Sequence, residues 1–343
     1  MTETPATDVP LAERVDAPGI VRPEPVDGVS WRAAGLDDVG AIVAHYAAMA
    51  SVDHPDWTET AEEIEDELTM SWVDLGADTL IGELGGRVVA FGQAVAPPEP
   101  ETVVRVILFG GVHPEFRGRG IGRALLGWLE GRGRQLLAAS GSALPGWLMM
   151  YSQATNEAAA HLAERAGFAT ERWFAQLERH LDTPIPELAL PAPLRLENLS
   201  QALSEPTRQA RNAAFRDHWG SQPSAEEGWA RFMGAETRRF DLSFVAMDGD
   251  EVVGFVILDV NEEDWALQGY RGSYISLVGV VSAWRRKGVA PALLAASLRA
   301  SAAADLERSV LDVDSESPTG AFGLYTGMGF AETNRSRAQV KRF

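Results

Sequence analysis

The chain has 343 residues, of which 30 are Lys or Arg and 49 are Asp or Glu, so its formal net charge is −19. At about 100–200 residues per domain this length predicts two domains, and a hydrophobic content of 45% excludes wholesale disorder. The negative charge disfavours nucleic-acid binding, because phosphate backbones would be repelled. Cysteine is absent, which excludes disulfides and thiolate metal ligands and favours the cytoplasm. The histidines lack metal-type spacing, so no metal is expected.

The N-terminal segment 1–27 has neither a basic region nor an apolar run, which argues against a secretory signal and predicts a disordered tail. No run approaches the ~18–20 apolar residues that would span a bilayer, so no membrane partner is expected. Residues 183–192 carry three prolines, Pro184, Pro186 and Pro191, and predict a semi-rigid linker.

Hydrophobic patterning predicts an α/β fold with a mixed sheet on each side of this linker, in domains 28–182 and 193–343. In the first domain, strands are expected at 29–33, 79–83, 88–94, 104–112, 148–153 and 172–181, and helices at 36–49, at 121–137 and ending at Gly167. In the second domain, a hairpin is expected from strands 243–247 and 252–260.

The two domains repeat each other. The stretch from Val106 to Gly122 and the stretch from Tyr274 to Ala290 both run from an apolar strand into a basic, glycine-containing turn. Asp53-His54 and Asp217-His218 precede these stretches, Gly167-Phe168 and Gly329-Phe330 follow them, and similar closing strands begin near Ala175 and Ala338. Several matches in one order indicate an internal duplication.

Each repeated turn has the pattern Arg-x-x-Gly-x-Gly/Ala between a strand and a helix. Glycine lets backbone amides converge, and a helix start offers free N–H groups and a positive dipole end, so the pattern predicts an anion site suited to a diphosphate. A tight turn with solvated basic residues is the simpler alternative. The candidate phosphate-binding residues are Arg117, Gly118, Arg119, Gly120, Ile121 and Gly122 in the first copy and Arg285, Arg286, Lys287, Gly288, Val289 and Ala290 in the second.

At these turns the sequence resembles the GNAT superfamily of N-acetyltransferases, in a tandem two-domain form. The later family motif, Asn-x-x-Ala-x-x-Leu-Tyr-x-x-x-Gly-Phe, is present twice and altered twice: Asn156 is kept but Ala163 replaces Tyr in the first copy, whereas Tyr325 is kept but Pro318 replaces Asn in the second. The resemblance implies acetyl-CoA as co-substrate, bound by the turns and by Asn156, and direct attack of an amine on the thioester.

The resemblance also implies roles in catalysis. Backbone N–H groups of Val280 and Val281, and of Val112 and His113, would polarise the thioester carbonyl. Tyr325 would donate to the departing sulfur, so the second domain is expected to be catalytic and the first impaired. Asp259 and Glu262 are candidate bases, although they could be solvated loop acids, and bulk water could deprotonate a weakly basic amine.

An acceptor site is expected at Asp217, His218 and Trp219, where an acid and an indole could hold a cation. The equal alternative is a helix–helix corner with Trp219 and Trp229 as core. The expected function is acetyl transfer to a primary amine of a small molecule by a monomer or homodimer, and the alternative is a non-catalytic acyl-CoA sensor.

Overall fold

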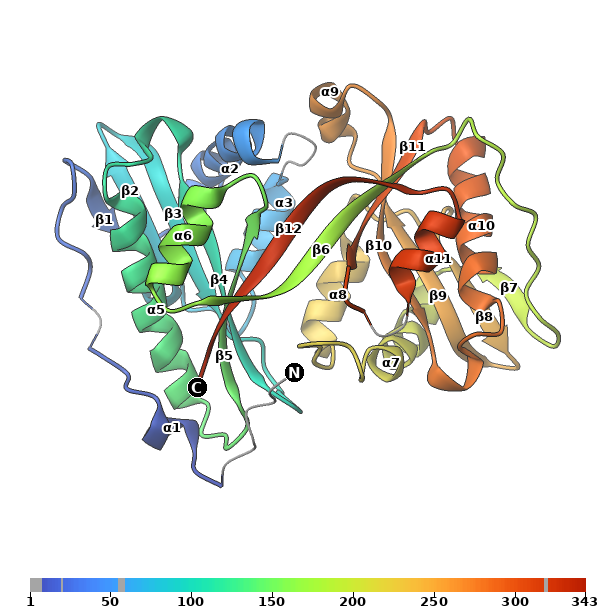
Figure 1. Ribbon diagram of the computed structural model, residues 1–343, viewed down its shortest axis with the longest axis horizontal. Helices are drawn as coiled ribbons and strands as arrows, with labels where there is room; N and C mark the ends of the chain where they lie inside the picture. Colours follow the sequence, from blue (N-terminus) through green and yellow to red (C-terminus); the bar gives the residue numbers. More distant parts are fainter. Residues whose placement is uncertain (1–7, 20, 55–58, 318–319) are drawn as a thin grey trace. The chain divides into compact units, whose positions relative to one another are not determined.

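The computed structural model describes residues 8–19, 21–54, 59–317 and 320–343. Backbone contacts divide the chain into unit 1, which comprises Met1–Arg172 and Ser336–Phe343, and unit 2, which comprises Trp173–Arg335. Each unit has a mixed sheet with helices on its faces, so the predicted fold class is confirmed (Figure 1).

The sheet of unit 1 has the strand order β1-β2-β3-β4-β5-β12. All neighbours in it are antiparallel except β4 and β5, which are parallel. The strands are β1 (Ser30–Arg32), β2 (Thr79–Leu84), β3 (Arg87–Val95), β4 (Val104–Val112), β5 (Gly146–Gln153) and β12 (Ala331–Arg342). The helices are α1 (Leu11–Arg14), α2 (Val39–Asp53), α3 (Ala61–Leu68), α4 (Leu75–Asp78), α5 (Ile121–Ala139) and α6 (Glu157–Arg165), with 3-10 turns η1 (Leu36–Asp38) and η2 (Pro114–Phe116).

The sheet of unit 2 repeats this plan in the order β6-β11-β10-β9-β8-β7, with β10 and β11 parallel. The strands are β6 (Ala169–His180), β7 (Arg195–Asn198), β8 (Phe244–Asp248), β9 (Glu251–Asp259), β10 (Gly272–Val280) and β11 (Arg308–Asp314). The helices are α7 (Ser204–Ala214), α8 (Glu226–Gly234), α9 (Trp265–Gln268), α10 (Val289–Ala303) and α11 (Ala321–Gly327), with 3-10 turns η3 (Gln201–Leu203), η4 (Glu262–Asp264) and η5 (Ser282–Trp284). The hairpin expected around residues 243–260 is confirmed as β8 and β9.

The closing strands are exchanged between the two repeats. β6 follows α6 in the chain but pairs with β11, with Leu177 opposite Leu311. β12 follows α11 but pairs with β5, with Val340 opposite Met149. The sequence predicted domains 28–182 and 193–343, each keeping its own last strand, so the compact units differ from those ranges. Local patterning cannot report this exchange, because the sequences of the two closing strands near Ala175 and Ala338 are similar.

Each sheet has an apolar cluster on both faces. In unit 1, α5 packs on one face through Leu125 and Leu129, whereas α2 and α3 cover the other through Ile42 and Ile64. In unit 2, α10 and α11 form one cluster, and α7 and α8 form the other. Sandwiching between helix layers accounts for the near-continuous apolar runs of the central strands.

The segment 1–27 differs from the expected disordered tail over its described part. Leu11 and Val15 are buried in the α5-side cluster of unit 1. The Leu11 N–H donates to the Ser142 carbonyl at 2.7 Å, and Arg14 Nη2 donates to the Ala143 carbonyl at 3.1 Å. Two apolar side chains in an otherwise polar stretch are enough to dock it. The linker 183–192 also lies on protein, since Ile185 and Leu190 pack against the α10 cluster.

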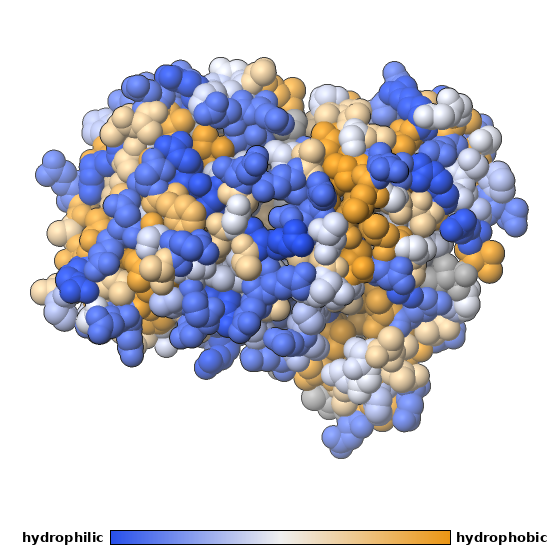
Figure 2. Space-filling model, turned by 180° about the vertical axis from the view of Figure 1, so that it is seen from behind, coloured by the Kyte–Doolittle hydropathy of each residue, from blue (hydrophilic) through white to orange (hydrophobic). Residues whose placement is uncertain are grey.

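The face shown in Figure 2 carries many hydrophilic side chains, and hydrophobic ones gather in a band to the right of its centre. The strongly exposed large apolar side chains of the described chain are few and scattered along it, for example Val21, Val52 and Leu196. Among the described residues, no helix combines the length and the hydropathy needed to cross a bilayer.

Candidate active site

A fork opens between the two parallel strands of each sheet. In unit 1 the pairing of β4 with β5 runs from Val104 to Ile107 and ends opposite Met149. In unit 2 the pairing of β10 with β11 ends where Tyr274 meets Val310. Beyond these residues the described β4–β5 and β10–β11 pairing stops, so the two strands of each pair separate there.

The direction of the backbone amides identifies which of them face the fork. The N–H of Val281 donates to the Val253 carbonyl at 3.0 Å, and the N–H of His113 donates to the Val89 carbonyl at 2.9 Å. These two groups, expected to polarise a thioester, are therefore occupied by the neighbouring strand. Because successive residues of an antiparallel strand point their N–H groups to opposite sides, those of Val280 and Val112 face the fork.

The turns after β4 and β10 have the same backbone form. Gly118 and Gly120 take φ values of 79° and 87°, and Arg286 and Gly288 take 60° and 84°. The second and fourth residues of each turn thus lie in the left-handed region. This conformation is natural for glycine and costly for Arg286. No side chain caps α5 or α10, which begin directly after Gly120 and Gly288. A diphosphate fits this cradle, since the first N–H groups of both helices lack side-chain acceptors.

Unit 1 contains a cavity of about 620 Å³ at its fork and turn. Its walls are the strand ends Leu108–Val112 and Met150–Gln153, the turn glycines Gly118, Gly120 and Gly122, and Asn156. Asn156 also accepts the Ala159 N–H at 3.1 Å and so caps α6. Fork, turn and Asn156 therefore line one space, of a size typical for small-molecule sites.

The basic side chains of the turns have different contacts: some lie against aromatic rings, and others donate to protein oxygens. Arg119 lies 5.1 Å from the ring centre of Phe116 and 3.3 Å from the Asp27 carboxylate, and Lys287 lies 4.6 Å from the ring centre of Trp284. Arg117 and Arg285 are bound to protein carbonyl and carboxylate oxygens. These two arginines, expected to add positive charge for phosphates, thus donate to protein oxygens in the structure.

Tyr325 lies on α11 in the same apolar cluster as Val289 at the start of α10, and Val280 and Val281 pack against that cluster. Its side chain is buried, and burial raises the pKa of its phenol above the ordinary value of 10.0. The phenol is thus neutral near pH 7 and can act as a donor. Ala163, which occupies the same place in unit 1, is buried and has no donor. Pro318 lies outside the described residues.

The two candidate bases have different surroundings. Asp259 Oδ1 lies 2.8 Å from Arg238 Nη1, and its other oxygen accepts from the Ser276 hydroxyl. Burial nevertheless raises the pKa of the Asp259 carboxyl, against the opposing effect of Arg238. Glu262, at the start of η4, is exposed. Asp259 is thereby held in a buried network, and Glu262 is the more accessible carboxylate.

A polar pair that sequence reasoning missed lies beside the fork of unit 2. The Tyr274 hydroxyl donates to Asp312 Oδ2 at 2.9 Å. Tyr274 pairs with Asp259 across β9 and with Val310 across β11, so Tyr274, Asp259 and Asp312 share the sheet face that α7 and α8 cover. Only the strand register could reveal this, because Tyr274 and Asp312 belong to no recognisable motif.

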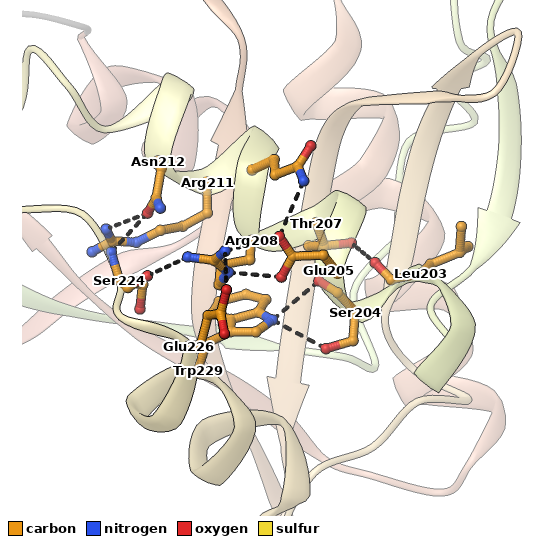
Figure 3. Close-up of polar contacts among 11 residues, drawn as sticks. Leu203, Ser204, Glu205, Thr207, Arg208, Arg211, Asn212, Ser224, Glu226 and Trp229 are labelled. Atoms are coloured by element: carbon orange, nitrogen blue, oxygen red, sulfur yellow. Dashed lines mark hydrogen bonds and ion pairs between the residues drawn. The ribbon is translucent and has the colours of Figure 1, made fainter. Parts of the chain in front are cut away.

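The segment after α7 holds the three predicted acceptor residues at its surface. Asp217 is exposed and 3.4 Å from Arg285 Nη1, and His218 and Trp219 are half-buried. The neighbouring Trp229 is buried and donates through Nε1 to the Ser204 carbonyl at 3.0 Å, as Figure 3 shows. Arg208 of α7 donates to the Ser224 carbonyl at 2.9 Å and lies 3.7 Å from Glu226 of α8, so it helps to join the two helices (Figure 3). The helix-corner interpretation therefore holds for Trp229.

A buried histidine adjoins the fork of unit 1. His45 on α2 is 2% exposed, and its Nε2 lies 3.2 Å from the Gly111 carbonyl. Burial, reinforced by nearby cations, lowers the pKa of His45 to about 4. Its ring is therefore neutral near pH 7 and donates from Nε2. Among the described residues, no group of three His, Asp or Glu could hold a metal ion.

A family model, the acetyltransferase (GNAT) family, matches residues 46–168 and 204–330, one match in each repeat. The chain therefore belongs to the GNAT family of acetyltransferases, and its class of enzyme is N-acetyltransferase. A mycothiol acetyltransferase of Thermobispora bispora is 31% identical over 72% of this chain and 77% of its own length. One from Frankia casuarinae is 34% identical over 64% of this chain, which spans 63% of that relative's length.

Solved structures agree on the tandem architecture. A GCN5-related N-acetyltransferase from Sphaerobacter thermophilus superposes with a TM-score of 0.70 at 25% identity, covering 92% of this chain and 96% of its own. A tandem GNAT protein from the clavulanic acid biosynthesis pathway gives a TM-score of 0.65 at 15% identity, covering 92% and 98%. The second comparison bears on the fold alone.

Proposed function

We propose that the chain transfers the acetyl group of acetyl-CoA directly to a primary amine of a small molecule, and that unit 2 performs this reaction. The observation that carries the proposal is the single apolar cluster that joins Tyr325, the start of α10 at Val289 and the fork residue Val280. Tyr325 as the sulfur's hydrogen-bond donor, the start of α10 as the diphosphate site and Val280 as the carbonyl donor would thereby lie close together. The mycothiol acetyltransferase relatives support a small-molecule acceptor.

The start of α10 would hold the diphosphate of acetyl-CoA, and bound acetyl-CoA supplies an activated thioester. The N–H of Gly288, Val289 and Ala290 would donate to the phosphate oxygens, aided by the helix dipole. Pro291 is the next residue and has no N–H, which is harmless in a first helical turn. Position 288 has room for this contact, because a Cβ placed there would meet no heavy atom within 4 Å.

Val280 would polarise the thioester carbonyl through its fork-facing N–H. Such a fixed donor is worth roughly 2.7–4 kcal/mol when charge develops on the oxygen. Tyr325 would donate a hydrogen bond to the departing sulfur. Its raised pKa favours the protonated phenol, so stabilisation of the thiolate by hydrogen bonding comes before any proton transfer.

The amine would approach from the sheet face that α7 and α8 cover, where Tyr274 and Asp312 lie. A carboxylate there would attract an ammonium group, and Glu262 or water would take its proton before attack. Asp259 is held by Arg238 and Ser276 and would act by keeping β9 and β10 in register. Asp217, His218 and Trp219 would border the acceptor at the surface.

Unit 1 would bind acetyl-CoA in its 620 Å³ cavity without matching catalysis, because Ala163 gives the sulfur no donor. This observation also supports the second candidate function, an acyl-CoA sensor. A screen of primary amines, including amines related to mycothiol, separates the two. Release of CoA can be followed with a thiol reagent, since the chain has no cysteine. Release that depends on one amine supports the enzyme; acetyl-CoA binding without release from any amine favours the sensor.

A further inference from the structure

The arginine that opens each turn bonds the carbonyl of a strand end and also reaches the end of a helix in both repeats. In unit 1, Arg117 Nε donates to the Val112 carbonyl at 3.0 Å. Its Nη1 and Nη2 donate to the two oxygens of Asp53 at 2.8 and 2.5 Å. The guanidinium therefore joins the last residue of β4 to the last residue of α2. The bidentate pair is well shielded, with 15% of the Asp53 side chain exposed.

In unit 2, Arg285 repeats this arrangement in another sequence context. Its Nε donates to the Val280 carbonyl at 3.2 Å, and its Nη2 donates to the Ala214 carbonyl at 2.7 Å. Nη1 reaches Asp217 at 3.4 Å. Ala214 is the last residue of α7, so this guanidinium joins the end of β10 to the end of α7, as Arg117 joins β4 to α2. Both arginines thus connect the same two elements of their repeat, through a carboxylate in unit 1 and mainly through a backbone carbonyl in unit 2.

These contacts oppose a direct role in phosphate binding. An arginine has five N–H donors, and Arg117 directs donors of all three nitrogens to protein oxygens. A carboxylate beside the guanidinium would also repel a diphosphate. Swinging Arg117 into the cradle would break a bidentate ion pair and leave Asp53 without that partner.

We propose that Arg117 and Arg285 are positioning residues, struts that fix the acceptor-side helix against the fork and thereby hold the cofactor turn in its binding form. Asp53 is the second half of the strut in unit 1, and Ala214 with Asp217 is its counterpart in unit 2. In unit 2 the strut would also set the segment 214–220 relative to the thioester. The inference rests on the proposed acetyl-CoA site.

The test is whether Asp53→Asn weakens or tightens the binding of acetyl-CoA. Amide hydrogen exchange of the peptide spanning 119–124, measured against acetyl-CoA concentration in the full chain, reads affinity at the unit 1 turn alone. For a strut, Asp53→Asn weakens acetyl-CoA binding about tenfold, Arg117→Gln does the same, and the double variant adds little, because the two residues act as one. For a phosphate ligand, Asp53→Asn leaves binding unchanged or tightens it, and this result would overturn the proposal.

Arg117→Lys gives an independent reading, because lysine keeps the charge but not the fork of donors. If Arg117 is a strut, this variant loses its contacts and binds acetyl-CoA more weakly. If Arg117 binds phosphate, the contact is largely kept, so wild-type affinity for acetyl-CoA in Arg117→Lys contradicts the proposal. Asp27→Asn is the matched control at the same turn, since it removes a carboxylate beside Arg119 without touching the strut. It should leave affinity unchanged or slightly tighter.

A second control separates positioning from loss of stability. Asp38→Asn removes another bidentate arginine pair of unit 1, with Arg32 at β1, and β2 and β3 separate β1 from the fork strand. It should lower the unfolding midpoint as Asp53→Asn does, yet leave acetyl-CoA binding intact. Equal weakening in both variants would contradict a specific strut. If acetyl-CoA protects no peptide of the wild type, the acetyl-CoA site itself is wrong, which is a different failure.

Discussion

Gly146 and Phe343 exchange two backbone hydrogen bonds: the Gly146 N–H donates to the Phe343 carbonyl at 3.0 Å, and the Phe343 N–H donates to the Gly146 carbonyl at 2.8 Å. The last residue of the chain thus closes the sheet of unit 1 at the first residue of β5. Ala338 and Val340 of the same strand are buried. The fold of unit 1 therefore depends on residues 336–343, which are far in sequence from the rest of that unit.

Removal of residues 336–343 should destabilise unit 1 by several kcal/mol. The truncation deletes the pairing partner of β5 and exposes its apolar residues, and each buried aliphatic side chain contributes about 1.5–3 kcal/mol. Hydrogen exchange of the β5 amides should rise sharply, whereas that of β9 changes less. Arg335→Ala, on an exposed part of the same strand, is the control. Unchanged protection of β5 in the truncated chain would contradict the strand exchange as a determinant of stability.

Tyr325→Phe should lower kcat about 100-fold with little change in acetyl-CoA affinity, because only the hydrogen bond to the departing sulfur is lost. The variant keeps the ring that packs at 5.9 Å from Phe330, so the fold should persist. Steady-state kinetics with the active amine and calorimetry with acetyl-CoA measure the two effects. Unchanged kcat, with chemistry limiting, would refute the donor role.

Gly288→Val and Gly120→Val should each abolish one acetyl-CoA site. A β-branched side chain is strained at φ values of 84° and 87° and would crowd the N–H groups of the cradle. Calorimetric stoichiometry should fall from two to one in each variant and turnover should be lost in Gly288→Val alone. Gly127→Ala, inside α5 with free space around its Cβ, is the control. A wild-type stoichiometry of one would make one cradle structural.

His45→Gln should make stability less dependent on acid pH. In the folded chain the pKa of His45 is about 4, below its ordinary value of 6.5, so as the pH falls the unfolded chain takes up this proton first. The stability is fully present above about pH 6.5 and declines toward pH 4, by about 2 kcal/mol at pH 5 at ~1.36 kcal/mol per pKa unit. Urea unfolding at pH 7 and pH 5 measures the difference. An equal loss in wild type and His45→Gln would exclude His45 as the cause.

Tyr274→Phe and Asp312→Asn should raise KM for the amine acceptor about tenfold and leave acetyl-CoA affinity unchanged. Each change disrupts the pair at the acceptor face of the fork, whereas the cofactor turn is made by other residues. Thr333→Val, which removes a hydroxyl that bonds to Gln176 of β6, is the control within unit 2. An effect on acetyl-CoA alone would remove the pair from the acceptor site.

The sequence by itself determined the repeat, the fold class and the position of both turns. These features depend on local chemistry: glycine at left-handed φ, a basic turn before a helix, and an apolar strand before the turn. Gly120 and Gly288 could be identified because their backbone form restricts the residue type. The family resemblance added the acetyl group and Tyr325, which periodicity alone would leave as a core aromatic.

Tertiary structure decided what the long-range partners do. From the sequence, Arg117 is predicted to bind phosphate. The structure shows that it instead donates to Asp53, which is far away in sequence. Tyr274 and Asp312 become a pair through the register of β10 and β11. Strand β12 closes the sheet of unit 1 because the edge of β5 needs hydrogen-bond partners. Backbone groups are the same in nearly all residues, so the sequence does not indicate which strand supplies them. Local patterns fix the conformation of a segment, whereas its partner is chosen by the competition of all segments for the same edge.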